Sequence, residues 1–134
     1  MIVDTRKTLC VDFDNCIHNM SEGWQGGRLY GAVVTGFFDW FRRTHKDFRI
    51  VIFSTRCLDA EHLNKMSEWL IEKYDQWAEL NSHADETRPT IEFSDKKIPA
   101  IAYIDDRAIR FTGNWEDYDL TVEALKEFRP WNEA

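Results

Sequence analysis

Short apolar runs alternate with amphipathic stretches along this chain, and the two patterns predict different elements. Runs rich in Val, Ile, Leu and Phe indicate buried strands, whereas apolar residues that recur every three or four positions indicate helices. We expect strands over about residues 7–13, 49–53, 90–93, 100–104 and 108–111. We expect helices over about residues 32–44, from the capping residue Asp59 through Trp77, and over 120–128, where Val122, Leu125 and Phe128 face the core. Strands that alternate with helices are typical of α/β proteins with a parallel sheet and helices on both faces.

Length and charge narrow the class of protein. The chain has 134 residues, which suits a single domain over residues 1–134 and leaves no room for a large cap domain. The net charge of −7 and the pI near 5.0 disfavour bulk binding to duplex nucleic acid, whose phosphates reward a basic surface. No apolar run approaches the ~20 residues of a membrane span, and no signal-peptide pattern is present. Because three cysteines without metal-ligand spacing also fit reduced thiols, we expect a cytoplasmic protein.

Two acidic pairs follow predicted strands. Asp12 and Asp14 end the first strand, and Asp105 and Asp106 follow the fourth. Each pair comes directly after an apolar run, where unpaired negative charge is costly unless a cation or a proton compensates it. An aspartate after a strand is commonly only a turn former or a helix cap, so either pair alone is a weak signal. Together, the clustered acids indicate a divalent cation.

A hydroxyl and an ammonium group complete the pattern. Ser54 follows the second strand, and Lys97, with Lys96 as its alternative, lies shortly before the second acidic pair. Ser54 can donate to a phosphate oxygen, and Lys97 can neutralise charge shared by a nucleophile and a phosphoryl group. An extended backbone places Asp12 and Asp14 on one face at the strand's carboxyl end, where open parallel sheets bind ligands. One carboxylate can then attack phosphorus while the other, kept protonated, donates to the leaving oxygen.

The order of these residues resembles the signature motifs of the haloacid dehalogenase (HAD) superfamily, especially its small capless phage and bacterial members. The resemblance covers almost the whole chain and includes the run from Lys97 through Ala108. It implies a Rossmann-like three-layer sandwich with about five parallel strands and the first strand central. It also implies a bound Mg2+ and these roles: Asp12 as nucleophile and metal ligand, Asp14 as general acid/base and backbone-carbonyl metal ligand, Ser54 and Lys97 as phosphate binders, and Asp105 and Asp106 as metal ligands. Asn15 and Cys16 depart from the usual Gly-Thr pair, which implies a looser loop and reduced turnover.

Other side chains near these motifs have both a functional and a structural interpretation. His18 either contacts substrate or lies in a solvated loop, and Arg56 could reach phosphate. Arg107 is better explained as a brace for its acidic neighbours. Trp24 and Trp115 form an aromatic wall for a substrate or cover the core. A catalytic thiol is disfavoured, because no His/Asn partner pattern accompanies the cysteines.

These features favour a Mg2+-dependent phosphomonoester hydrolase that works through an aspartyl-phosphate at Asp12. An open site without a cap suits a small phosphorylated metabolite or a nucleotide as substrate. Two alternatives stay open at this point. One is a 3′-phosphatase acting on nucleic acid ends, which the acidic pI disfavours. The other is a catalytically weak HAD-like binding or regulatory module, for which Cys16 is the sequence hint.

Overall fold

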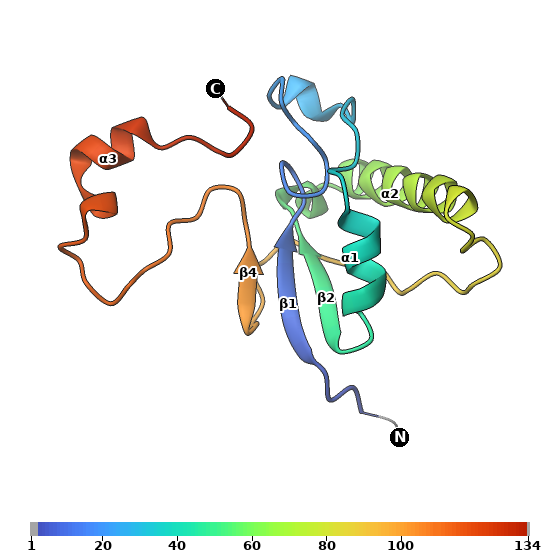
Figure 1. Cartoon of the computed structure of the whole chain (residues 1–134). Helices are drawn as coiled ribbons and strands as arrows, with labels where there is room; N and C mark the ends of the chain where they lie inside the picture. The colour runs from blue at the N-terminus through green and yellow to red at the C-terminus, as the bar shows by residue number, and fades with distance from the viewer. Residues whose placement is uncertain (1–2, 134) are drawn as a thin grey trace.

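The computed structural model describes residues 3–133 and contains an open sheet of parallel strands. In this part of the chain the sheet has four strands in the order β3-β2-β1-β4, so β1 is internal and pairs with both β2 and β4 (Figure 1). The strands are β1 (Lys7–Asp12), β2 (Phe48–Phe53), β3 (Glu92–Ser94) and β4 (Ala102–Ile104). The predicted α/β fold with a parallel, Rossmann-like sheet is therefore confirmed, with β1 internal as expected.

The predicted fifth strand over residues 108–111 is wrong. These residues have no strand partner in the described structure, and Phe111 is exposed. The local sequence favours an extended chain, but a strand also needs an edge to pair with and neighbours to pack against. After Asp106 the chain leaves the sheet, so neither is within its reach (Figure 1).

The structure has three α-helices and three 3-10 turns within the described residues, and local residues explain where α1 and α2 begin. They are α1 (Phe37–Thr44), α2 (Ala60–Leu80) and α3 (Val122–Glu127), with 3-10 turns η1 (Gln25–Gly27), η2 (Thr55–Leu58) and η3 (Tyr118–Leu120). Asp59 caps α2 as predicted, because its side chain accepts hydrogen bonds from the amides of Glu61 and His62. α1 begins later than predicted, because Gly36 has a φ of 87° and a left-handed conformation that a helix cannot include. Within residues 3–133, no helix combines the length and apolar character that a membrane crossing demands.

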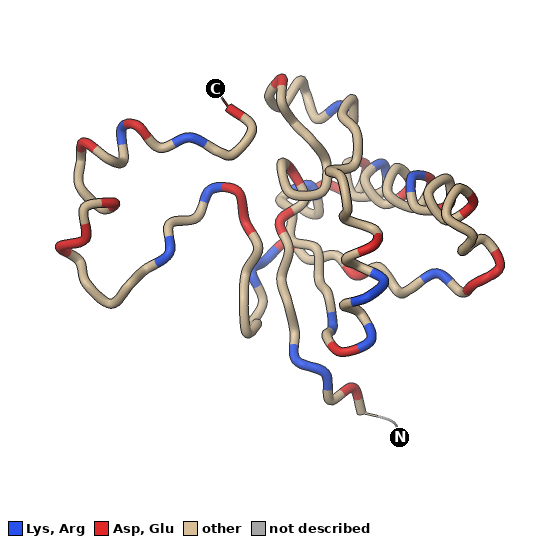
Figure 2. The backbone as a smooth tube through the Cα atoms, in the orientation of Figure 1, with Lys and Arg blue, Asp and Glu red and all other residues tan. Residues whose placement is uncertain are grey.

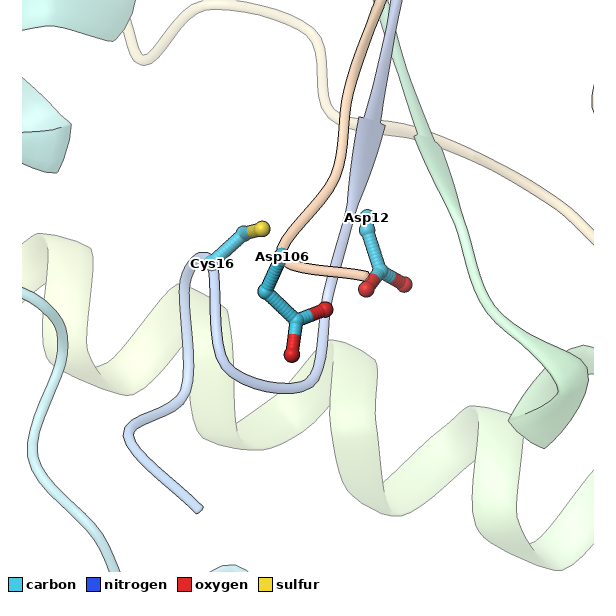
Figure 3. Close-up of side chains that lie close together, drawn as sticks. All are labelled: Asp12, Cys16 and Asp106. Atoms are coloured by element: carbon cyan, nitrogen blue, oxygen red, sulfur yellow. The ribbon is translucent and has the colours of Figure 1, made fainter. Parts of the chain in front are cut away.

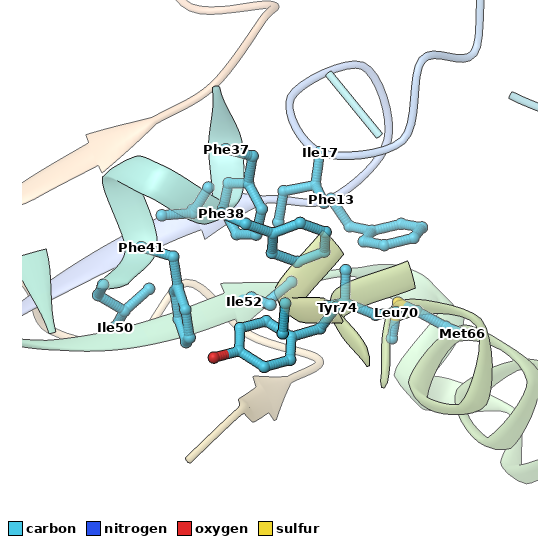
Figure 4. Packing of buried hydrophobic residues seen from close by; sticks show 12 residues of the cluster. Phe13, Ile17, Phe37, Phe38, Phe41, Ile50, Ile52, Met66, Leu70 and Tyr74 are labelled. Carbon is cyan, nitrogen blue, oxygen red and sulfur yellow. The ribbon is translucent and has the colours of Figure 1, made fainter. Parts of the chain in front are cut away.

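The main core lies between one face of the sheet and the helices α1 and α2 (Figure 4). The ring centroids of Phe38 in α1 and Tyr74 in α2 are 5.4 Å apart, so the two helices meet over the same face. Complete burial of such a side chain contributes roughly 1.5–3 kcal/mol. This layer therefore fixes β1 and β2, whose carboxyl ends carry the acidic and hydroxyl residues. Its buried members include Val11, Phe13, Ile17, Phe37, Phe38, Phe41, Ile50, Ile52, Met66, Leu70, Tyr74 and Ala78.

The opposite face of the sheet is covered by a crossover rather than by a helix. Residues 95–101 connect β3 to β4 at opposite edges of the sheet, and the Tyr103 hydroxyl donates to the Ile98 carbonyl at 2.7 Å. Cys10 and Val51, which are neighbours in the strand register, are buried on this face. The crossover is too short to include a helix that packs on the sheet. The prediction of helices on both faces, and with it the three-layer sandwich, therefore holds for one face only.

The chain beyond Asp106 forms an arm (residues 107–130) that extends away from the sheet and carries α3 (Figure 1). The prediction that α3 turns its apolar face toward the core is wrong, because Val122 is 66% exposed and Leu125 is also exposed. An amphipathic period predicts that a helix has an apolar side, but it does not show that the domain supplies a partner for that side. At its end the chain returns to the domain through a tail (Trp131 and Asn132), near the loop that follows β1.

Candidate active site

The carboxyl ends of β1 and β4 bring two carboxylates together. Asp12 is the last residue of β1, and Asp106 lies two residues beyond Ile104, which the strand register pairs with Val11. One ligand atom from each of Asp12, Asp106 and Cys16 lies within 4.8 Å of the others (Figure 3). Acidic positions gather at this edge of the sheet (Figure 2). The predicted convergence of the two acidic pairs is therefore present for Asp12 and Asp106.

The Asp12–Asp106 pair has the properties of a cation site. The Asp106 side chain is 3% exposed, and its Oδ2 atom has no hydrogen-bond partner among the described residues. Arg107 Nε lies 3.7 Å from this oxygen, too far for a hydrogen bond. Burial, a hydrogen bond with Asp106 and repulsion by the neighbouring carboxylates raise the pKa of Asp12 to about 8. The raised pKa means that the Asp12 carboxyl group disfavours a negative charge here, and a hard divalent cation such as Mg2+ would compensate that charge at the same oxygens.

Asp105 has a different partner from Asp106. Its Oδ2 accepts a hydrogen bond from Lys97 Nζ at 3.0 Å, and its Oδ1 accepts one from the Arg107 amide at 2.8 Å. Burial opposes ionisation of Asp105, but these hydrogen bonds outweigh it and lower its pKa. The hydrogen bond to Asp105 also raises the pKa of Lys97. Of the two acids that the sequence could not distinguish, Asp106 faces Asp12 and Asp105 holds the lysine.

Cys16 lies beside the carboxylates as a neutral thiol. Burial, followed by the negative charges of Asp12 and Asp106, raises its pKa to about 12. The thiolate is the nucleophilic form of cysteine, so a thiol that stays protonated near neutral pH is a poor nucleophile. Sulfur is also a poor ligand for Mg2+, which leaves the carboxylates as the side-chain donors of the site.

Asp14 turns away from this pair toward Arg56. Arg56 Nε donates to Asp14 Oδ2 and Arg56 Nη2 donates to Asp14 Oδ1, each at 3.0 Å, and His18 Nδ1 lies 3.1 Å from Asp14 Oδ1. Burial opposes ionisation of Asp14, but the hydrogen bonds from His18 and Arg56 outweigh it and lower its pKa. Asp14 is therefore a carboxylate near neutral pH. This finding opposes the expectation that Asp14 is kept protonated as a general acid.

His18 is a fully buried structural residue, not a solvated or substrate-facing one. Its Nε2 atom accepts a hydrogen bond from the Gly31 amide at 3.0 Å, so the ring proton sits on Nδ1 and is donated to Asp14. The Gly31 backbone must come close, because a Cβ atom at this position would lie 1.9 Å from the Asn19 carbonyl oxygen. His18 thus ties the glycine-containing loop to the end of β1.

Arg56 completes the same buried cluster. It is 2% exposed, its Nη1 donates to the Gly27 carbonyl at 2.8 Å, and its guanidinium carbon lies 4.5 Å from the centroid of the Trp24 ring. Trp24 therefore covers Arg56 with one face of its ring and is 45% exposed, whereas Trp115 is 80% exposed on the arm. Arg56 was predicted as a residue that could reach phosphate. The only local signal for its role as the partner of Asp14 was its position just after the second strand.

Ser54 lies at the same edge of the sheet, one residue beyond the Asp12–Phe53 register pair. The side chain is buried, and its Oγ accepts a hydrogen bond from the Arg56 amide at 3.1 Å, which caps η2. This is the structural role that a serine commonly has after a strand. The bond uses an oxygen lone pair, so the hydroxyl proton is left to donate to a ligand. Ser54 can thus serve both the fold and a bound phosphate.

Without a cation, ionisation of Asp12 is expected to destabilise the folded protein. The pKa of Asp12 is about 8 in the folded protein against the usual 3.8 of an aspartate. Well below pH 3.8 both the folded and the unfolded state carry this proton, and the folded state loses stability relative to the unfolded state as the pH rises from there through about 8. Asp12→Asn removes this loss, and after discounting for partial exposure we expect it to add about 1–3 kcal/mol at pH 8 and little at pH 4.

Urea denaturation of both proteins in a chelator at the two pH values measures this difference. Asp39→Asn, on the exposed side of α1, is the matched control and should show no comparable change. A stability gain that is equal at pH 4 and pH 8 would mean that ionisation of Asp12 is not its cause.

Comparison of the chain with family models, with curated proteins and with solved structures finds no match. The site therefore has to be interpreted from its own geometry and chemistry. These define a domain with a parallel sheet, paired carboxylates at its carboxyl edge, and a lysine and a hydroxyl beside them.

Proposed function

We propose that this protein is a Mg2+-dependent phosphomonoester hydrolase that works through an aspartyl-phosphate at Asp12. The observation that carries the proposal is the convergence of Asp12 and Asp106, with one buried carboxylate oxygen of Asp106 that accepts no hydrogen bond from the described residues and has only a 3.7 Å ion pair with Arg107. Lys97, paired with Asp105, and Ser54 add a positive charge and a hydroxyl donor at the same edge of the sheet. Carboxylates around a cation, with separate donors for phosphoryl oxygens, are what phosphoryl transfer requires.

In the proposed reaction a carboxylate oxygen of Asp12 attacks phosphorus, and the bond from phosphorus to the leaving oxygen breaks. Lys97 and Ser54 contact the non-bridging oxygens and stabilise the negative charge that they gain. A water molecule then attacks phosphorus, which releases inorganic phosphate, returns a proton to solvent and restores the Asp12 carboxylate. Asp12 and Asp106 would hold Mg2+, which supplies positive charge that lets the nucleophile and the phosphate approach.

The source of the proton for the leaving oxygen limits the range of substrates. Because Arg56 and His18 keep Asp14 as a carboxylate, Asp14 can donate a proton only if this pair opens. We therefore propose that the leaving oxygen takes its proton from water while the pair is closed. Substrates whose leaving group departs as a stable anion should then react faster than alkyl phosphates.

The substrate class that we propose is a small phosphorylated metabolite or a nucleotide. The single small domain offers an open edge of the sheet to such a molecule. A 3′-phosphatase that acts on nucleic acid ends is less favoured, because the net charge of −7 repels a polymer of phosphates.

A second candidate function is a binding or regulatory module that keeps the cation site but has little turnover. The specific observation in its favour is the Asp14–Arg56–His18 cluster, which removes the expected general acid from its role. Hydrolysis of p-nitrophenyl phosphate with and without Mg2+ separates the two functions, because nitrophenolate leaves without needing an acid. Mg2+-dependent release supports the hydrolase, whereas Mg2+ binding without release supports the module.

The cation site itself is tested by comparing the two adjacent acids. Asp106→Asn should weaken Mg2+ binding by about 10-fold or more, because it removes a carboxylate that faces Asp12. Asp105→Asn should have a smaller effect, because this residue holds Lys97. Calorimetric titration measures both affinities, with Asp39→Asn as the charge-matched control. Equal affinities in wild type and Asp106→Asn would place any bound cation elsewhere.

A further inference from the structure

The tail of the chain contacts the loop that carries the site. Trp131 Nε1 donates to the Asn15 carbonyl oxygen at 2.7 Å, and Asn132 Nδ2 donates to Asn15 Oδ1 at 2.8 Å and to Asn19 Oδ1 at 3.1 Å. Trp131 and Asn15 are 116 residues apart in the sequence. The hydrogen bonds and ion pairs found within residues 3–133 include none that joins residues 108–129 to the rest of the domain. The arm is therefore held to the domain at its two ends, next to Asp106 and through the tail (Figure 1).

The residue that the tail contacts has a left-handed backbone conformation. Asn15 lies between Asp14 and Cys16 and has a φ of 67°, a region that asparagine tolerates better than most residues other than glycine. It is also only 3% exposed, so its polar groups need partners within the protein. Its amide donates to the His18 carbonyl at 2.7 Å and its Oδ1 accepts from the Met20 amide at 2.9 Å, and the tail supplies two further hydrogen bonds. The tail thus helps to hold the turn that sets the positions of the residues on either side.

The tail contact is itself incompletely satisfied. Asn132 Oδ1 is buried and has no hydrogen-bond partner among the described residues. A buried polar atom without a partner costs free energy, so it weakens the docked state of the tail. Trp131 also keeps much of its side chain exposed. These features suit a contact that opens and closes, and they do not suit a permanent part of the core.

We propose that Trp131 and Asn132 form a latch that is coupled to cation binding at Asp12 and Asp106. The docked tail holds Asn15, which directly follows Asp14, in its turn at the end of β1. When the tail is undocked, this turn and the neighbouring carboxylates are less ordered, so the protein binds the cation more weakly. Coupling between two sites is reciprocal, so the cation in turn favours the docked tail. Trp131 and Asn132 act through Asn15 and are positioning residues. The inference rests on the cation site of the proposed function, but it does not require hydrolysis.

Titration with Mg2+ tests the latch in one direction. Trp131→Phe removes the indole donor and keeps an aromatic ring, and Asn132→Ala removes the amide. Each should weaken Mg2+ binding by about 3- to 10-fold. Trp115→Phe on the exposed arm and Asn64→Ala on the exposed side of α2 are the matched controls, and both should bind as wild type does. If both tail variants bind Mg2+ with unchanged affinity, the latch is overturned. If Asp106→Asn still loses binding in that case, the cation site stands without the latch.

Digestion of the wild-type protein tests the opposite direction without any change to the tail. A serine carboxypeptidase, which needs no metal of its own, should remove the residues of the tail several-fold more slowly in Mg2+ than in chelator, as followed by mass spectrometry. The same comparison with Asp106→Asn should show no protection, which excludes a direct effect of Mg2+ on the protease. Equal rates for wild type in both conditions overturn the coupling. If wild type binds no Mg2+ in the titration, the cation site and the coupling fail together.

Discussion

Asp12→Asn is expected to lower the rate of p-nitrophenyl phosphate hydrolysis by at least about 1,000-fold, because the amide cannot form the covalent bond to phosphorus. The fold should survive, since the substitution removes a carboxyl group whose pKa of about 8 shows that its charge is disfavoured. Rates would be measured at saturating Mg2+ and pH 7, with far-UV circular dichroism as the test of folding.

Asp39→Asn is the control for this measurement, because it makes the same chemical change on an exposed helix and should keep the wild-type rate. A folded Asp12→Asn protein that retains near-wild-type turnover would remove the aspartyl-phosphate mechanism. The cation site could then still stand, because Asp106 and the Asp12 amide oxygen keep some ligand capacity.

Arg56→Ala is expected to destabilise the protein by about 2–4 kcal/mol, because it leaves the Asp14 carboxylate without the partner that forms two of its hydrogen bonds. It also removes the guanidinium that packs against Trp24 and bonds to the Gly27 carbonyl. Urea denaturation at pH 7 gives the free energy of unfolding, and a double-mutant cycle with Asp14→Ala isolates the pair.

The Arg49–Glu92 pair provides the matched comparison, since both of its side chains are partly exposed at the surface. Arg49→Ala should cost less than about 1 kcal/mol, as is usual for surface ion pairs. Similar losses in Arg56→Ala and Arg49→Ala would show that the buried Asp14–Arg56 pair contributes no more than a surface pair, and the stated role of Asp14 would have to be revised.

The convergence of Asp12 with Asp106 could be predicted because it follows from general properties of parallel sheets. Apolar runs reveal the strands, the carboxyl ends of neighbouring strands lie at one edge, and polar residues at those ends meet. The capping of α2 by Asp59 was predictable for a similar reason, since a cap depends on residues close in sequence.

The partner of Asp14 could not be predicted in the same way. The pairing with Arg56 depends on how the turn after β1 and the turn after β2 pack, and on the buried His18 that orients the carboxylate. Spacing along the strand therefore predicted one orientation for Asp14, and contacts between distant segments impose another. The prediction that the apolar face of α3 packs against the core failed for a related reason. The periodicity of the helix shows which side is apolar, but it does not show that the preceding chain carries the helix away from the sheet.

The position of Asp106 so late in the chain has a consequence for the order in which the protein acquires its structure. The unit from β1 through α2 already contains the large aromatic core, and it is complete once residue 80 has been synthesised. β4 and the tail join it afterwards through contacts between residues far apart in the sequence, which form slowly because a long loop must close first. A nascent chain should thus pass through a stage with a folded core and no affinity for Mg2+, and metal in the cell should have no influence on its early folding.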